Sequence, residues 1–156
     1  MYRKRNLWLK RGFFIGAAAF VFLIIFIARM IHLGPDNQAE EAIDQFYQYE
    51  QEGDFSESWS LFHSTMKDRF ERGDYIKDRA HVFMNHFGVK TFSYEIGKVE
   101  EIKDWKITGE SVPIALAYKA EVIQTFKGKY GNFDIHQDVY AIEEEGEWRI
   151  SWDYNQ

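Results

Sequence analysis

The longest apolar stretch of the chain lies near its N-terminus. Residues 12–33 read GFFIGAAAFVFLIIFIARMIHL and are interrupted only by Arg29 and His32. As a helix that rises about 1.5 Å per residue, this stretch would extend roughly 33 Å, enough to cross a hydrocarbon core of about 30 Å. Five basic residues lie within 1–11, and the positive-inside rule places that end in the cytoplasm. The pattern predicts a cytoplasmic tail (1–11), a transmembrane anchor helix (12–33) and an extracytoplasmic domain (36–156).

A cleaved secretory signal is the alternative to an uncleaved anchor. Signal peptides have an apolar region of about 7–15 residues that ends in a small-x-small cleavage site. The apolar run is longer here, and bulky residues lie near its end: Phe26, Ile27, Ile31 and Leu33. We therefore expect a single-pass protein of the cell membrane that keeps its anchor.

The first half of residues 36–156 has the pattern of three amphipathic helices. In 37–52, apolar residues recur every three or four positions with acidic residues between them, which is typical of a helix with one buried face. A shorter helix follows from Asp54, and a third begins at Gly73-Asp74 and ends before Gly88. The apolar residues of the three predicted faces are Ala39, Ile43, Phe46, Tyr47, Phe55, Trp59, Phe62, Ile76, Ala80, Phe83, Met84 and Phe87.

After Gly88 the apolar residues alternate with polar ones, which indicates half-buried strands. The strands are expected at 92–96, 112–122, 133–142 and 148–154. Helices that precede an antiparallel sheet form an α+β domain in which the helices cover one face of the sheet. Trp148 and Trp152 fall on the same side of the last strand, so both are predicted to be buried beneath the helices.

The charge is unevenly distributed along the chain. Residues 1–35 contain six of the 19 basic residues and no acid, so the other 13 face all 25 acids and give 36–156 a formal charge of −12. Such an acidic domain is a poor ligand for nucleic acid or anionic lipid, which attract dense Lys and Arg. The chain has no cysteine, which excludes disulfides, thiolate nucleophiles and cysteine–zinc sites.

Three blocks of sequence carry a resemblance to a known family. They are Tyr75-Ile76 through His86 to Lys90, Ala117-Tyr118 through Thr125-Phe126, and Gly146 to Asp153 with its W-x-x-x-W-D pattern. The chain resembles the nuclear transport factor 2-like N-terminal domain of methicillin-resistance-type penicillin-binding transpeptidases over nearly all of 36–156. The resemblance implies an N-terminal anchor, a cone of three helices on a curved antiparallel sheet, and a role in cell-wall synthesis and the response to antibiotic. The large transpeptidase domain that follows in that family is not expected in this sequence.

Ser64 to Lys67 matches S-x-x-K, the nucleophile motif of penicillin-interacting enzymes, in which the lysine helps to activate the serine. Tyr130 to Asn132 is similar to a second motif of certain β-lactamases. No K-T-G follows, however, and a four-residue match is unsurprising in a chain with seven serines and eleven lysines. We expect Ser64 and Lys67 to lie in a wet connection between helices, and Tyr130 to Asn132 to form a turn.

The remaining candidates for chemistry are scattered. His81 and His86 are five residues apart, about 140° around a helix, so they do not chelate one ion as histidines four apart do. His136 lies beside Asp138 in a predicted strand and could line a pocket. Carboxylates that could act as an acid or base in the cone are Glu95, Glu121, Asp134 and Asp153, and each fits equally well as the outward residue of its strand. We assign no catalytic residue, metal or cofactor.

These patterns favour a non-catalytic, membrane-anchored extracytoplasmic module for interaction or ligand binding. The resemblance makes it an accessory of cell-wall or envelope assembly, with protein partners in the cell envelope and no nucleic acid. One alternative is a small-molecule-binding or acid–base pocket enzyme of the same fold. Another is a subunit of a secretion or conjugation apparatus.

Overall fold

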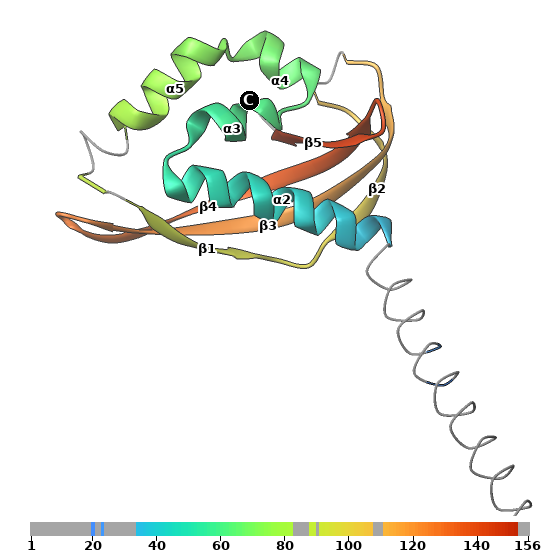
Figure 1. The fold of residues 1–156 in the computed structure, drawn as a ribbon, viewed down its shortest axis with the longest axis horizontal. Coiled ribbons are helices and arrows are strands. Elements are labelled where there is room, and N and C mark those ends of the chain that lie inside the picture. The colour runs from blue at the N-terminus through green and yellow to red at the C-terminus, as the bar shows by residue number, and fades with distance from the viewer. Residues whose placement is uncertain are drawn as a thin grey trace, which may run out of the picture. The chain divides into compact units, whose positions relative to one another are not determined.

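The computed structural model describes residues 20, 23, 34–82, 88–89, 91–107 and 111–152. Within these residues, four helices precede five strands (Figure 1). The helices are α2 (Pro35–Glu52), α3 (Phe55–Ser60), α4 (Ser64–Arg69) and α5 (Arg72–Ala80). The strands are β1 (Phe92–Ile96), β2 (Glu100–Trp105), β3 (Ile114–Gly128), β4 (Gly131–Glu144) and β5 (Glu147–Trp152). The predicted α+β class with an antiparallel sheet agrees with this order.

The predicted membrane anchor is not supported. In the part of the chain that the structure describes, no helix is both long enough and apolar enough to cross a membrane. The longest of these helices, α2, has 18 residues, but its polar face carries acids such as Glu40 and Asp44. The fold with an N-terminal transmembrane helix and the localisation in the cell membrane are therefore corrected. The tail 1–11 and the segment 12–33, apart from Phe20 and Leu23, lie outside the described residues.

Helix α2 forms as its apolar period predicts and lies against the sheet (Figure 1). The helix ends where Gly53 adopts a φ of 79°, and the Asp54 side chain then accepts a hydrogen bond from the Glu57 N–H to cap α3. The third predicted helix forms as α5, which ends at Ala80, and the remainder of that prediction, residues 83–87, lies outside the described residues.

Helix α4 was not predicted, so the count of three covering helices is wrong. Residue His63 caps this helix, and its Nδ1 accepts a hydrogen bond from the Thr65 N–H at 3.3 Å. The Ser64 N–H donates to Glu144 Oε2, 80 residues further along the chain, at 3.2 Å. A cap that depends on a histidine and on a distant strand has no local sequence signature.

The five strands form one antiparallel sheet in the order β1-β3-β4-β5, with β2 also paired to β3. Strand β1 has the predicted bounds, whereas β2 was not predicted. Both strands pair with the same edge of β3 and run in the same direction, and residues 97–99 interrupt the pairing between them. The Gly97 N–H donates to the Glu121 carbonyl at 2.8 Å, and a Cβ on Gly97 would lie only 3.1 Å from that oxygen. Glycine therefore permits the close approach that keeps β1 and β2 on one edge.

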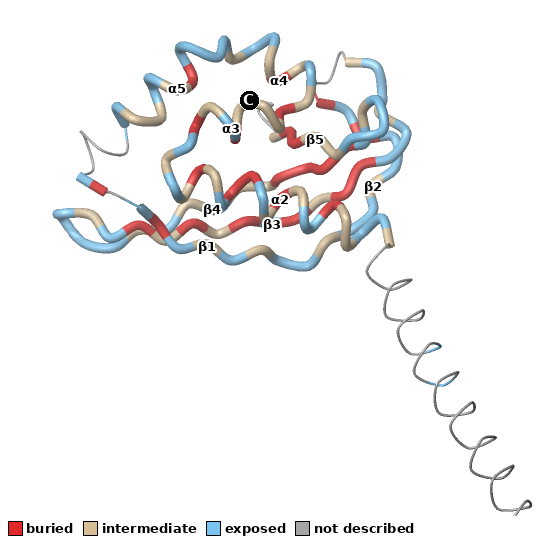
Figure 2. The backbone as a smooth tube through the Cα atoms, in the orientation of Figure 1, coloured by how far each residue is buried: buried red, intermediate tan, exposed pale blue. Residues whose placement is uncertain are grey.

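The main core lies between the helices and the sheet, where the buried segments of α2 face those of β3 and β4 (Figure 2). The fully buried members with large side chains include Ile43, Phe46, Tyr47, Phe62, Met66, Val122, Phe126, Val139 and Ile150. Trp148 and Trp152 pack against this core from the same side of β5, as predicted, but both are half-buried rather than fully buried. Segment 61–63 runs beside β5, and Phe62 pairs with Ile150 in a parallel bridge.

A second, smaller core contains Trp105, Ile107, Ala117, Tyr140 and Ile142. Asp104 has a φ of 51°, and this left-handed backbone interrupts the alternation of β2 just before Trp105. Trp105 then stacks on Tyr140 with ring centroids 3.9 Å apart. Because Val139 and Ala141 belong to the main core and Tyr140 does not, this cluster covers the opposite face of the sheet.

Candidate functional site

The best-connected polar group inside the domain is the carboxylate of Glu50. Its Oε1 accepts hydrogen bonds from Ser58 Oγ at 2.5 Å and from the Tyr75 hydroxyl at 2.8 Å. Its Oε2 accepts from Arg79 Nε at 2.6 Å and also from Arg79 Nη2, which completes an ion pair. We call Glu50, Ser58, Tyr75 and Arg79 the Glu50 cluster. It joins the helices α2, α3 and α5 to one another.

Glu50 reaches this position because it continues the apolar stripe of α2. It follows Phe46 and Tyr47 by four and three residues, so its side chain lies on the face that packs against the domain. The side chain has no exposed surface, whereas that of Arg79 is 20% exposed. An acid on a buried helical stripe is the sequence signal that could have identified this cluster.

The Glu50 cluster is poorly suited to acid–base chemistry. Four donors already occupy the carboxylate, which leaves little capacity to accept a substrate proton. Burial, reinforced by the charge of Glu50, raises the pKa of Tyr75 well above its usual value. Burial also raises the pKa of the neighbouring Tyr47, whose hydroxyl donates to Gln137 Oε1 at 3.2 Å. Both phenols therefore stay protonated at neutral pH and act as hydrogen-bond donors.

The S-x-x-K motif lies, as predicted, in the connection between the second and third expected helices (α3 and α5), but this connection contains the short helix α4, with Ser64 at its first position and Lys67 one turn later. Lys67 Nζ lies 5.5 Å from the centre of the Trp59 ring, while the Ser64 backbone is bound to Glu144. Burial, followed by the positive charge of Arg149, lowers the pKa of Lys67. The serine and the lysine thus contact different partners, although the lysine is less basic than a fully exposed one.

His63 joins the same region to the end of β4. Its Nε2 lies 3.4 Å from Glu144 Oε1, and its Nδ1 accepts the capping hydrogen bond from Thr65. Burial lowers the pKa of His63 although the nearby Glu144 opposes that shift. His63 is therefore a neutral cap at neutral pH, with its two nitrogens committed to Thr65 and Glu144.

The other candidates from the sequence do not converge on a pocket. Glu95, Glu121 and Asp134 are exposed, and Asp153 lies outside the described residues. His136 is also exposed and lies 3.1 Å from Glu121 Oε1. His81 is exposed at the end of α5, and His86 is not among the described residues. Within the described part of the chain, no group of three or more His, Asp or Glu residues could hold a metal ion.

Among the described residues, Gln124 Nε2 and Ser151 Oγ are buried without a hydrogen-bond partner. Gln124 is paired with Tyr94 in the sheet and lies on its helical face. Ser151 is paired with Tyr140, which belongs to the smaller core on the opposite face. These atoms therefore do not form a single binding site.

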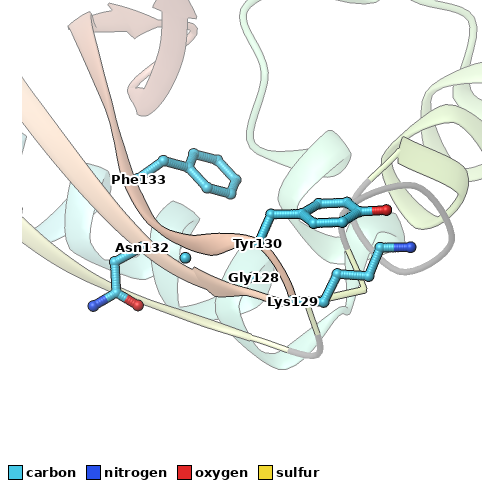
Figure 3. A pocket seen from close by; sticks show the side chains of 6 residues that line it. Gly128, Lys129, Tyr130, Asn132 and Phe133 are labelled. Carbon is cyan, nitrogen blue, oxygen red and sulfur yellow. The ribbon is translucent and has the colours of Figure 1, made fainter.

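An open depression lies at the end of the β3–β4 hairpin, with a volume of about 260 Å³. We call it the hairpin depression; it is lined by Gly128, Lys129, Tyr130, Gly131, Asn132 and Phe133. Figure 3 shows the rings of Phe133 and Tyr130 on one side of the hairpin, with Lys129 beside Tyr130 and Asn132 directed to the other side. Tyr130 is 87% exposed and lies in the turn, as expected, whereas Gly131 and Asn132 already belong to β4.

The fold and these clusters define an α+β domain with a closed polar interior and an open aromatic hairpin. No family model matches the chain, and no curated protein matches it.

Proposed function

We propose that this protein is a non-catalytic binding module that associates with a partner protein. The observation that supports this proposal is a contrast between its interior and its surface. Inside the domain, the carboxylate of Glu50 accepts four hydrogen bonds from its own neighbours and is closed to a ligand. At the hairpin, by contrast, Tyr130 presents a large ring to solvent, and exposed aromatic residues are enriched where proteins bind other proteins.

The resemblance to the N-terminal domain of methicillin-resistance-type transpeptidases suggests the class of partner. Such domains accompany a penicillin-binding enzyme of the cell wall. A domain of this type would serve as an accessory that binds such an enzyme and contributes no nucleophile of its own.

A cross-linking experiment tests the proposal. The tagged full-length chain is cross-linked in its native cells and purified, and the product is treated with fluorescent penicillin. We expect a labelled transpeptidase to co-purify, while the band of the protein itself stays unlabelled. A tagged chain with Tyr130→Ala serves as the matched control and should recover less of the enzyme. Recovery of no penicillin-binding protein, or labelling of the chain itself, would refute the proposal.

A further inference from the structure

The hairpin depression has aromatic walls that the rest of the domain holds in place. The ring of Phe133 stacks on Phe126, with centroids 5.1 Å apart and planes 8° apart. Phe126 in turn contacts Phe92 of β1 at 5.1 Å. On the outer side, Lys129 Nζ lies 4.7 Å from the centre of the Tyr130 ring. The wall formed by Phe133 therefore continues the main core, and the other wall is the exposed ring of Tyr130 beside the ammonium group of Lys129.

Two glycines explain why the space beside these rings is open. Gly128 and Gly131 are paired across the hairpin end, and neither contributes a side chain. A Cβ on Gly131 would meet no atom within 4 Å. Gly131 also has a φ of 126°, a backbone conformation that other residues rarely adopt. Because neither glycine has a side chain, these two positions leave the depression unfilled.

The local charge differs from that of the rest of the domain. Residues 122–133 contain Lys127 and Lys129 and no acid, in a chain whose formal net charge is −6. A cationic tip on an acidic domain attracts an acidic group and orients it toward the hairpin. The aromatic wall supplies contact area, and the lysines supply charge selectivity.

We propose that the hairpin depression binds a segment of a partner protein that presents an aromatic side chain next to an acidic residue. The aromatic ring packs beside Phe133 and Tyr130, and the carboxylate lies near Lys129. A volume of about 260 Å³ accommodates one such side chain and is too small for a helix. This inference rests on the proposed function as a binding module and names the chemistry of the partner.

The test is an NMR titration of the isotope-labelled full-length chain with two capped tripeptides, Glu-Trp-Glu and Lys-Trp-Lys. We expect Glu-Trp-Glu to shift the amides of Gly128, Gly131 and Asn132, and Lys-Trp-Lys to bind about threefold to fivefold more weakly at those amides, as expected for an exposed charge pair. Tyr130→Ala should weaken binding of Glu-Trp-Glu about tenfold through the loss of ring contact. Lys129→Glu should reverse the preference between the peptides.

Lys98→Glu is the matched control, because Lys98 has the same charge and is 85% exposed at its side chain but lies between β1 and β2. This variant should leave both affinities at the hairpin unchanged. Peptide shifts located elsewhere, equal affinity for the two peptides, or insensitivity to Tyr130→Ala would each overturn the inference. Loss of the hairpin site with continued co-purification of a transpeptidase would refute this site alone and leave the proposed function standing.

Discussion

Replacing Glu50 with leucine should strongly destabilise the domain. The side chain is completely buried, and its removal deprives Arg79 of its counter-ion and two hydroxyl groups of their acceptor. Breaking a buried ion pair from one side typically costs about 3–5 kcal/mol. Because Arg79 is 20% exposed and partly reaches water, we expect about 3 kcal/mol. This is a large fraction of the roughly 5–15 kcal/mol that stabilises a typical domain.

The double variant Glu50→Leu/Arg79→Met distinguishes the ion pair from simple packing. It removes both charges, so no charged group remains unpaired, and an apolar replacement of a buried pair is often close to neutral. We expect the double variant to be more stable than Glu50→Leu alone. The free energies of unfolding are measured by urea denaturation followed by circular dichroism, with the slope of each transition checked against the wild type.

Glu101→Leu provides the control for this prediction. Glu101 pairs with Lys103 at 3.4 Å on exposed β2, where an ion pair contributes only about 0–1 kcal/mol. If Glu50→Leu cost no more than Glu101→Leu, or if the effects of Glu50→Leu and Arg79→Met were additive, the assignment of the Glu50 cluster as a coupled buried network would be wrong.

Three further predictions address the remaining clusters. Because burial lowers the pKa of His63 below 6.5, the unfolded chain takes up this proton first, so stability should fall as the pH drops below 6.5. His63→Asn, which keeps a capping acceptor, should flatten that part of the curve of melting temperature against pH. Trp152→Ala should cost about 3 kcal/mol, because the ring packs against Phe46 and Phe62; an unchanged melting temperature would contradict this packing. Fluorescent penicillin should label neither the purified protein nor its Ser64→Ala variant, and labelling that the variant abolishes would identify Ser64 as a nucleophile.

The elements that the sequence predicted correctly are those whose residues face one core. The apolar stripe of α2 and the alternation of β1 arise from local periodicity, and burial of one face enforces that periodicity. Strand β2 was missed because its charged sequence EEIKDW lacks the apolar alternation that β1 shows on the same edge of the sheet. Helix α4 was missed because Glu144, 80 residues away in sequence, helps to cap it. A charged strand and a distant cap leave little local trace in a sequence.

The prediction of a membrane anchor is not supported either. Hydropathy and basic flanks indicate that a segment is apolar enough to span a bilayer. No described helix meets the requirement. The assignment of function therefore depends on the folded domain and its surface.

Sequence reasoning did not identify the buried polar cluster. It examined strand carboxylates and histidines, whose described members are exposed, and did not consider Glu50 on the buried stripe of α2. The turn at Tyr130 was predicted, but the depression beside it was not. That depression depends on the stacking of Phe133 on Phe126 and on the open space at Gly131, and both are tertiary features.

The Glu50 cluster and the hairpin depression have complementary roles in this fold. The cluster ties α2, α3 and α5 together through hydrogen bonds to one carboxylate. Because β3 and β4 are long, paired strands that carry the main core on one face and the smaller core on the other, we expect the hairpin at their end to be held more rigidly than a free loop. Rigid presentation reduces the entropy that a surface loses when it binds. An exposed Tyr130 on such a hairpin can therefore contribute more to affinity than the same ring on a mobile loop.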